Sequence, residues 1–170
     1  TERLTLSAQI QPWQVQPVLQ GEGQWHNLNL APLWTDAPQT RLTGQALMQA
    51  EGNTWRLEAQ TRNLQAGPWD QKRLPLSQWN LSARYQNQLW HVLQSQADLA
   101  GGRIQGQGQQ TPQGWTGQLD IQNLQPALLH SAWAGPAVQG RLKAEATGSD
   151  TIALSADLQA PKAQTPTAPP

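Results

Sequence analysis

Histidines and cysteines are the residues that would most readily bind a metal ion or carry nucleophilic chemistry. His26, His91 and His130 lie far apart in the sequence and lack the i, i+3 or i+4 spacing that brings two imidazoles to one metal ion. The chain has no cysteine, which excludes disulfides, thiolate metal sites and cysteine nucleophiles. We therefore expect no metal site and no cofactor, and a structural or surface role for each histidine.

Two carboxylates raise the possibility of hydrolysis. Asp98 and Asp120 would form an acid–base pair if their strands were neighbours and the side chains met in a cleft. The competing interpretation is that both aspartates lie on solvent-facing strand surfaces. No G-x-S-x-G motif is present, and Gly106-Gln107-Gly108 lacks the following helix that a phosphate-binding loop requires. We therefore expect no enzyme activity, with a carboxylate-dependent hydrolase as the minor alternative.

The elements that carry these residues alternate in polarity with period two. Trp115, Gly117, Leu119 and Ile121 share one parity, and Gln118, Asp120 and Gln122 take the other, which is typical of a strand with one apolar and one solvated face. The same alternation covers Trp55–Thr61 and Ile152–Leu158, and no charged residue occupies the apolar parity of these three stretches. Turn sequences such as Glu51-Gly52-Asn53 separate the strands.

Alternation of this kind predicts an all-β fold with about eleven short strands and almost no helix. The expected strands are Leu4–Ile10, Trp13–Gln16, Gly23–Leu30, Arg41–Ala50, Trp55–Arg62, Leu76–Arg84, Leu89–Asp98, Arg103–Gln109, Gly114–Gln122, Val138–Ala146 and Ile152–Leu158. Either face of Leu89–Asp98 could be the apolar one, and Pro126–Trp133 is the only expected helix. Residues 1–159 are expected to form the sheet, and residues 160–170 a Pro/Thr/Ala-rich linker or disordered tail.

Composition excludes two classes of protein. Lys plus Arg and Asp plus Glu each number 11, so the net charge is zero and no basic stripe for nucleic acid is present. No apolar run approaches the ~18 residues of a membrane-spanning helix.

The aromatic residues are nine Trp, one Tyr and no Phe. Three roles are open for the tryptophans: packing on the sheet, stacking against sugars, and lining a surface that faces lipid.

Short motifs recur along the chain. Asn29-Leu30-Ala31-Pro32, Asn63-Leu64-Gln65 and Asn123-Leu124-Gln125-Pro126 share one form, and Arg41-Leu42-Thr43-Gly44 and Arg103-Ile104-Gln105-Gly106 share another. Their variable spacing predicts a sheet that grows hairpin by hairpin.

Four segments together resemble the TamB family, the inner-membrane-anchored subunits of the translocation and assembly module within the AsmA-like superfamily. They are Leu28–Leu33, Gly67–Leu76, Gly101–Gly108 and Asn123–His130, and the resemblance runs from about Thr1 to about Leu158. The family's N-terminal membrane anchor and C-terminal barrel-contacting region have no counterpart here, so we expect an internal segment.

The resemblance implies a long periplasmic sheet folded into a U, a "β-taco", with an apolar inner face. Such a groove is thought to conduct phospholipid between the inner and outer membranes of a Gram-negative bacterium, as in bridge-like lipid transfer proteins, and to support outer-membrane assembly. The implied partners are phospholipid acyl chains, neighbouring segments of the same full-length chain, and the outer-membrane barrel TamA through regions absent here. The alternative is a β-sandwich binding module, with glycans bound through Trp as one option.

The apolar parity of the expected strands defines the candidate groove lining. The lining residues are Leu4, Leu6, Ile10, Leu42, Met48, Trp55, Leu57, Leu81, Ile104, Trp115, Leu119, Ile121, Val138, Leu142, Ile152, Leu154 and Leu158.

Overall fold

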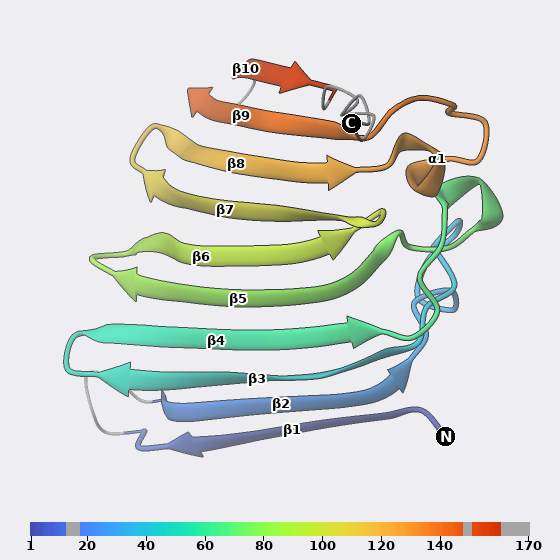
Figure 1. Cartoon of the computed structure of the whole chain (residues 1–170). Coiled ribbons are helices and arrows are strands. Elements are labelled where there is room, and N and C mark those ends of the chain that lie inside the picture. Colours follow the sequence, from blue (N-terminus) through green and yellow to red (C-terminus); the bar gives the residue numbers. More distant parts are fainter. Residues whose placement is uncertain (13–17, 148–150, 161–170) are drawn as a thin grey trace, which may run out of the picture.

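The chain forms one antiparallel sheet of ten strands whose spatial order is the order of the sequence (Figure 1). The computed structural model describes residues 1–12, 18–147 and 151–160. The strands are β1 (Arg3–Ile10), β2 (Val18–Leu28), β3 (Leu42–Glu51), β4 (Thr54–Asn63), β5 (Leu76–Gln86), β6 (Leu89–Leu99), β7 (Gly102–Thr111), β8 (Gly114–Leu124), β9 (Val138–Thr147) and β10 (Thr151–Gln159). The sheet is curved and does not close into a barrel, so the predicted all-β class is confirmed.

On one side of the sheet, which we call the hairpin end, two-residue connections join β3 to β4, β5 to β6 and β7 to β8, so each of these strands pairs with the next one along the chain. Gly52, between β3 and β4, has φ +60°, and Asn87 and Gln88, between β5 and β6, have φ 52° and 65°. These positive values suit the two-residue turns that join antiparallel strands. The Glu51-Gly52-Asn53 turn predicted from the sequence is present.

No second layer covers the sheet within the described residues. The buried apolar residues are Ala37, Leu42, Ala83 and Ala100, and no large side chain among the described residues is fully buried. Two packed sheets would bury the facing side chains of both in a core about 10 Å thick. The alternative of a closed β-sandwich is therefore wrong for this part of the chain.

The other end of the sheet, which we call the loop end, carries three longer excursions, at residues 29–41, 64–75 and 125–137 (right-hand side of Figure 1). Asn29 Oδ1 accepts hydrogen bonds from the backbone N–H groups of Ala31 (3.2 Å) and Thr40 (3.1 Å). Asn63 Oδ1 accepts from those of Gln65 (3.1 Å) and Arg41 (3.0 Å). At Asn29 and Asn63 the Asn-Leu motif thus turns the chain out of a strand and ties it to a neighbouring segment.

The excursions are bonded to one another across the end of the sheet. Gln39 N–H donates to Lys72 O (2.7 Å), and Ser131 N–H donates to Asp70 Oδ1 (2.9 Å). Gln71 Nε2 also donates to Ser131 Oγ (3.2 Å). These bonds tie each excursion to the next, so the loop end is a continuous rim.

Several predicted boundaries need correction. β2 ends at Leu28 rather than Leu30, because Asn29 turns the chain out of the strand through the hydrogen bonds to its Oδ1. Within β2, Asn27 takes φ 51° and the register shifts between Trp25 and Leu28. The helix is only α1 (Pro126–Leu129), since the backbone becomes extended at His130. A 3₁₀ turn, η1 (Trp69–Gln71), lies between the predicted strands Trp55–Arg62 and Leu76–Arg84. The predicted strand Trp13–Gln16 and residues 161–170 of the predicted tail lie outside the described residues.

Candidate functional site: an uncovered apolar face

One face of the sheet is apolar across all ten strands. Directly paired residues point to the same side, so the pairing register connects residues from β1 to β10 in rows. Two adjacent rows form what we call the central lane. The first row is Leu6, Gly23, Ala46, Ala59, Leu81, Ser95, Gly106, Leu119, Leu142 and Ala156, and the second is Ala8, Gly21, Met48, Leu57, Ala83, Val92, Gly108, Gly117, Ala144 and Leu154.

The central lane contains only aliphatic or small side chains, and larger aromatic side chains flank it on both sides. Towards the hairpin end, Tyr85 contacts Trp55 and Trp90, with ring centroids 5.7 and 5.1 Å apart. Trp115 stands on the same side of the lane in β8. Towards the loop end, the flanking row contains Trp25 and Trp79, paired through Gly44 and Thr61. The aromatic rings therefore border a lower strip that runs perpendicular to the strands.

Two indole N–H groups on the apolar face are hydrogen-bonded within the face itself. Trp25 Nε1 donates to Thr61 Oγ1 and Trp79 Nε1 donates to Ser95 Oγ, both at 2.9 Å. Each bond satisfies an indole N–H that would otherwise need water. The two hydroxyl groups therefore do not make the face hydrophilic.

A hollow of about 360 Å³ lies over β6–β10 on the apolar face. Three glycines of the central lane, Gly106, Gly108 and Gly117, line the bottom of this hollow, which is deeper there because they have no side chains. Leu119 and Leu142 line it as well. A flexible hydrocarbon chain is the kind of ligand that such a shallow, apolar depression suits.

All charged side chains of the described strands lie on the opposite face of the sheet. Among the ion pairs there, Arg103 Nε lies 3.0 Å from Asp98 Oδ1 and Arg141 Nε lies 2.8 Å from Asp120 Oδ1. The hydrogen bond from Arg141, with a second from Gln118, lowers the pKa of Asp120. The apolar face is thus free of charge over its described length.

The possible carboxylate pair is wrong. Asp98 lies on β6 and Asp120 on β8, and β7 runs between these two strands. Each aspartate has an arginine of an adjacent strand as its partner instead. The condition for an acid–base pair, that the strands of Asp98 and Asp120 are neighbours, is therefore not met.

The predicted lining residues fall on the apolar face. All except Ile10 and Val138 belong to the central lane, to its flanking rows, or, for Leu42, to the next row towards the loop end. Ile10 and Val138 stand next to register shifts and keep the alternation of their own strands. The structure thus brings the set together, while its role in binding lipid stays a prediction.

The open question about Leu89–Asp98 is answered by a bulge. Ala83 pairs with Val92 but Ser82 pairs with Gln94, so Leu93 is the extra residue and the alternation changes phase there. Trp90, Val92, Ser95 and Ala97 consequently share the apolar face. Sequence reasoning missed Trp90 and Val92 because the period-two pattern is broken between them and Ser95.

Other kinds of site find little support in the described residues. No group of three or more His, Asp or Glu side chains there is arranged to hold a metal ion. His130 stacks on Trp133 with centroids 5.3 Å apart and lies 4.0 Å from Asp70 Oδ1, at the exposed loop end. Neither helical segment described has the length and apolar character needed to cross a bilayer.

Comparisons with known proteins add no relative. No protein-family model, no curated protein and no solved structure matches this chain.

Proposed function

We propose that this chain is a non-catalytic segment of a periplasmic, bridge-like lipid transfer protein. Its central lane carries phospholipid acyl chains between the inner and outer membranes and so supports outer-membrane assembly. The observation that carries the proposal is the uncharged, uncovered apolar face that continues across ten strands. A contiguous apolar surface of this extent marks a site of interaction rather than an ordinary solvent-facing surface.

The dimensions of the lane suit hydrocarbon chains. Nine spacings of about 4.8 Å between neighbouring strands give a lane about 43 Å long. Burial is worth about 0.8 kcal/mol per methylene, so a 16-carbon chain gains on the order of 12 kcal/mol on leaving water. This gain requires continuous apolar contact and no specific polar ligand, which fits a lane without charged residues.

The exposure of the lane varies along its length. Side chains in the middle, such as Leu57 and Leu81, are half-buried among their neighbours. Near the two edges they are largely exposed, with Leu6 at 75% and Leu154 at 67%. No described strand pairs with the outer side of the edge strands β1 and β10. We propose that neighbouring segments of a longer chain pair with these edges and extend the lane, and that any contact with an outer-membrane barrel lies in such segments.

Native mass spectrometry of the chain after incubation with phosphatidylethanolamine vesicles tests the proposal. We expect the parent protein to retain phospholipid, and Leu119→Arg to retain little, because a charge in the lane is costly to place against acyl chains. Gln118→Arg adds the same charge one residue away on the polar face and should retain as much as the parent. Absence of lipid on the parent, or equal retention by Leu119→Arg, would refute the lane as a lipid site.

A further inference from the structure

A row of carboxamide side chains crosses the polar face, which the proposed lipid function does not use. The strand register pairs each member directly with the next on six successive strands, β2 to β7. We call this row the amide ladder, and its members are Gln24, Gln45, Gln60, Asn80, Gln96 and Gln105. At about 4.8 Å per strand, it spans about 24 Å perpendicular to the strands.

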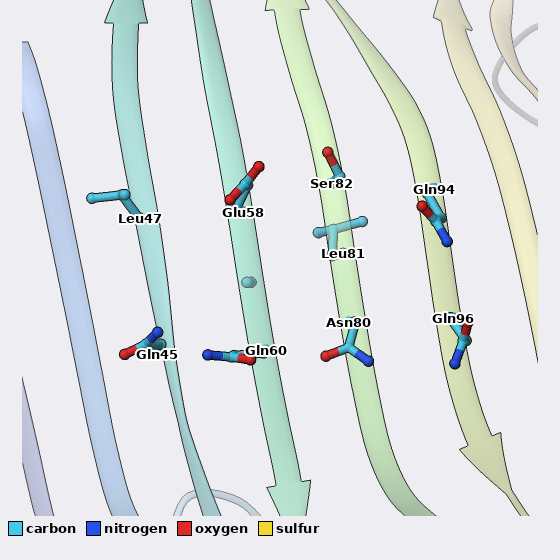
Figure 2. A pocket seen from close by; sticks show the side chains of 10 residues that line it. Gln45, Leu47, Glu58, Gln60, Asn80, Leu81, Ser82, Gln94 and Gln96 are labelled. Atoms are coloured by element: carbon cyan, nitrogen blue, oxygen red, sulfur yellow. The ribbon is translucent and has the colours of Figure 1, made fainter.

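The middle of the ladder forms one side of a hollow of about 370 Å³ on β3–β6. Figure 2 shows Gln45, Gln60, Asn80 and Gln96 at one level of four adjacent strands. The parallel row of register partners beside them consists of Leu47, Glu58, Ser82 and Gln94. The hollow is therefore a short trough that runs across the strands between two rows of side chains.

The amides in the middle of the ladder have no hydrogen-bond partner in the part of the chain that the structure describes. The side chains of Gln45, Gln60 and Asn80 make no hydrogen bond to any described residue. At the two ends of the ladder, Gln24 Nε2 donates to Glu22 (2.6 Å) and Gln105 Nε2 makes a long 3.4 Å contact with Gln96. Three adjacent carboxamides thus present both donors and acceptors to a ligand.

The charges around the trough indicate what kind of ligand it would accept. Glu58 is its only charged lining residue, and Arg56 Nη2 lies 2.6 Å from Glu58 Oε1. Beyond Gln105 the row continues into Asp120 and Arg141, which neutralise each other at 2.8 Å. No unpaired charge lines the trough itself, and the arginines Arg62 and Arg84 lie one row outside it.

We propose that the amide ladder binds a neutral, linear polysaccharide laid across the strands. Sugar hydroxyl groups both donate and accept hydrogen bonds, as carboxamides do, and successive sugars meet successive rungs because one pyranose unit is about as long as one strand spacing. Leu47 supplies an apolar contact for the C–H face of a sugar ring. An extended peptide would instead satisfy its backbone at an edge strand. This site lies on the opposite face from the lipid lane and does not depend on it.

Isothermal titration calorimetry with cellohexaose and chitohexaose tests the proposal. We expect at least one of these neutral hexasaccharides to bind the parent chain. The Gln60→Leu/Asn80→Leu variant should bind roughly tenfold more weakly or worse, since two hydrogen-bonding groups are lost. The matched control, Gln49→Leu/Gln109→Leu, removes two polar-face amides outside the ladder and should bind like the parent.

Three results would overturn the proposal. One is that the parent binds neither neutral hexasaccharide, and another is that the ladder and control variants bind equally well. The third is that hexagalacturonate, an acidic chain of the same length, binds more tightly than the neutral chains. Circular dichroism melting of both double variants shows whether the fold is retained. If the ladder variant melts early, side-chain amide NMR shifts of Gln45, Gln60 and Asn80 in the parent during titration decide the matter, since unchanged signals also overturn the proposal.

Discussion

Trp25 Nε1 donates a 2.9 Å hydrogen bond to Thr61 Oγ1 although β3 lies between their strands. The indole passes over Gly44, the residue of β3 that pairs with both of them. A Cβ at position 44 would lie 2.8 Å from Thr61 Cα and 2.9 Å from Trp25 Cε2. Because Gly44 has no side chain, the Trp25 ring can cross β3 and connect three strands on the apolar face.

Replacing Thr61 with valine should destabilise the fold. Valine keeps the shape of threonine but removes the acceptor, which leaves the half-buried indole N–H of Trp25 unpaired. We expect a loss of about 1 kcal/mol in the free energy of unfolding, measured by urea denaturation. Thr116→Val is the control, because no hydrogen bond of the Thr116 hydroxyl group to a described residue is found. Equal stability of the two variants would contradict this role of Thr61.

Gly44→Ala should destabilise more than the loss of the hydrogen bond. The added methyl group overlaps backbone of β4 and the Trp25 ring, so strands or ring must move, at a cost of about 1–3 kcal/mol. Gly135→Ala is the matched control, since nothing lies within 4 Å of a Cβ built there. A Gly44→Ala variant that melts with the parent would show that Trp25 does not cross β3 in this way.

The ion pair on the polar face makes a pH-dependent contribution. The hydrogen bond from Arg141 holds the pKa of Asp120 below its usual value, 3.8, so the pair's stabilisation is present above that pH and is lost as the pH falls through the lowered pKa. We expect Arg141→Gln to raise the pKa of Asp120, measured by ¹³C NMR titration of its carboxyl carbon. Lys143→Gln, which removes a charge on the same strand, should change it much less. An unchanged Asp120 pKa in Arg141→Gln would rule out the pairing.

Filling the hollow should displace lipid without unfolding the sheet. Gly117 lies in the central lane and lines this hollow, and a Cβ there would come no closer than 3.3 Å to Gln107 O. We expect Gly117→Leu to retain several-fold less phospholipid in native mass spectrometry while its melting temperature stays within a few degrees of the parent. Gly135→Leu, outside the lane, should retain lipid normally. Undiminished binding by Gly117→Leu would mean that acyl chains do not use this hollow.

Strand periodicity accounts for most of what the sequence predicts correctly. Wherever period two is unbroken, as in Trp55–Thr61, the apolar parity matches the apolar face of the structure. The pattern fails where backbone geometry changes its phase, at Leu93 in β6 and at Asn27 in β2. The residue type at these two positions does not by itself identify a change of phase.

Relationships between strands were out of reach of sequence reasoning for a different reason. The amide ladder depends on the pairing register, which no single strand contains; a shift of one residue would move Gln60 or Asn80 to the other face. The separation of Asp98 from Asp120 likewise follows from strand order. The Asn-Leu repeat at Asn29 and Asn63 is visible in the sequence. Only the structure shows from which backbone N–H groups their side-chain oxygens accept hydrogen bonds.

The most direct test of the account is photo-crosslinking with benzoylphenylalanine on both faces of the same strands. The probe replaces Leu57, Leu81 or Leu142 in the central lane, and Glu58, Asn80 or Lys143 next to them on the polar face. After illumination in the presence of phospholipid vesicles, we predict phospholipid adducts at the three lane positions and none at the three polar-face positions. Adducts at equal yield on both faces, or no adduct in the lane, would contradict the claim that the apolar face carries acyl chains.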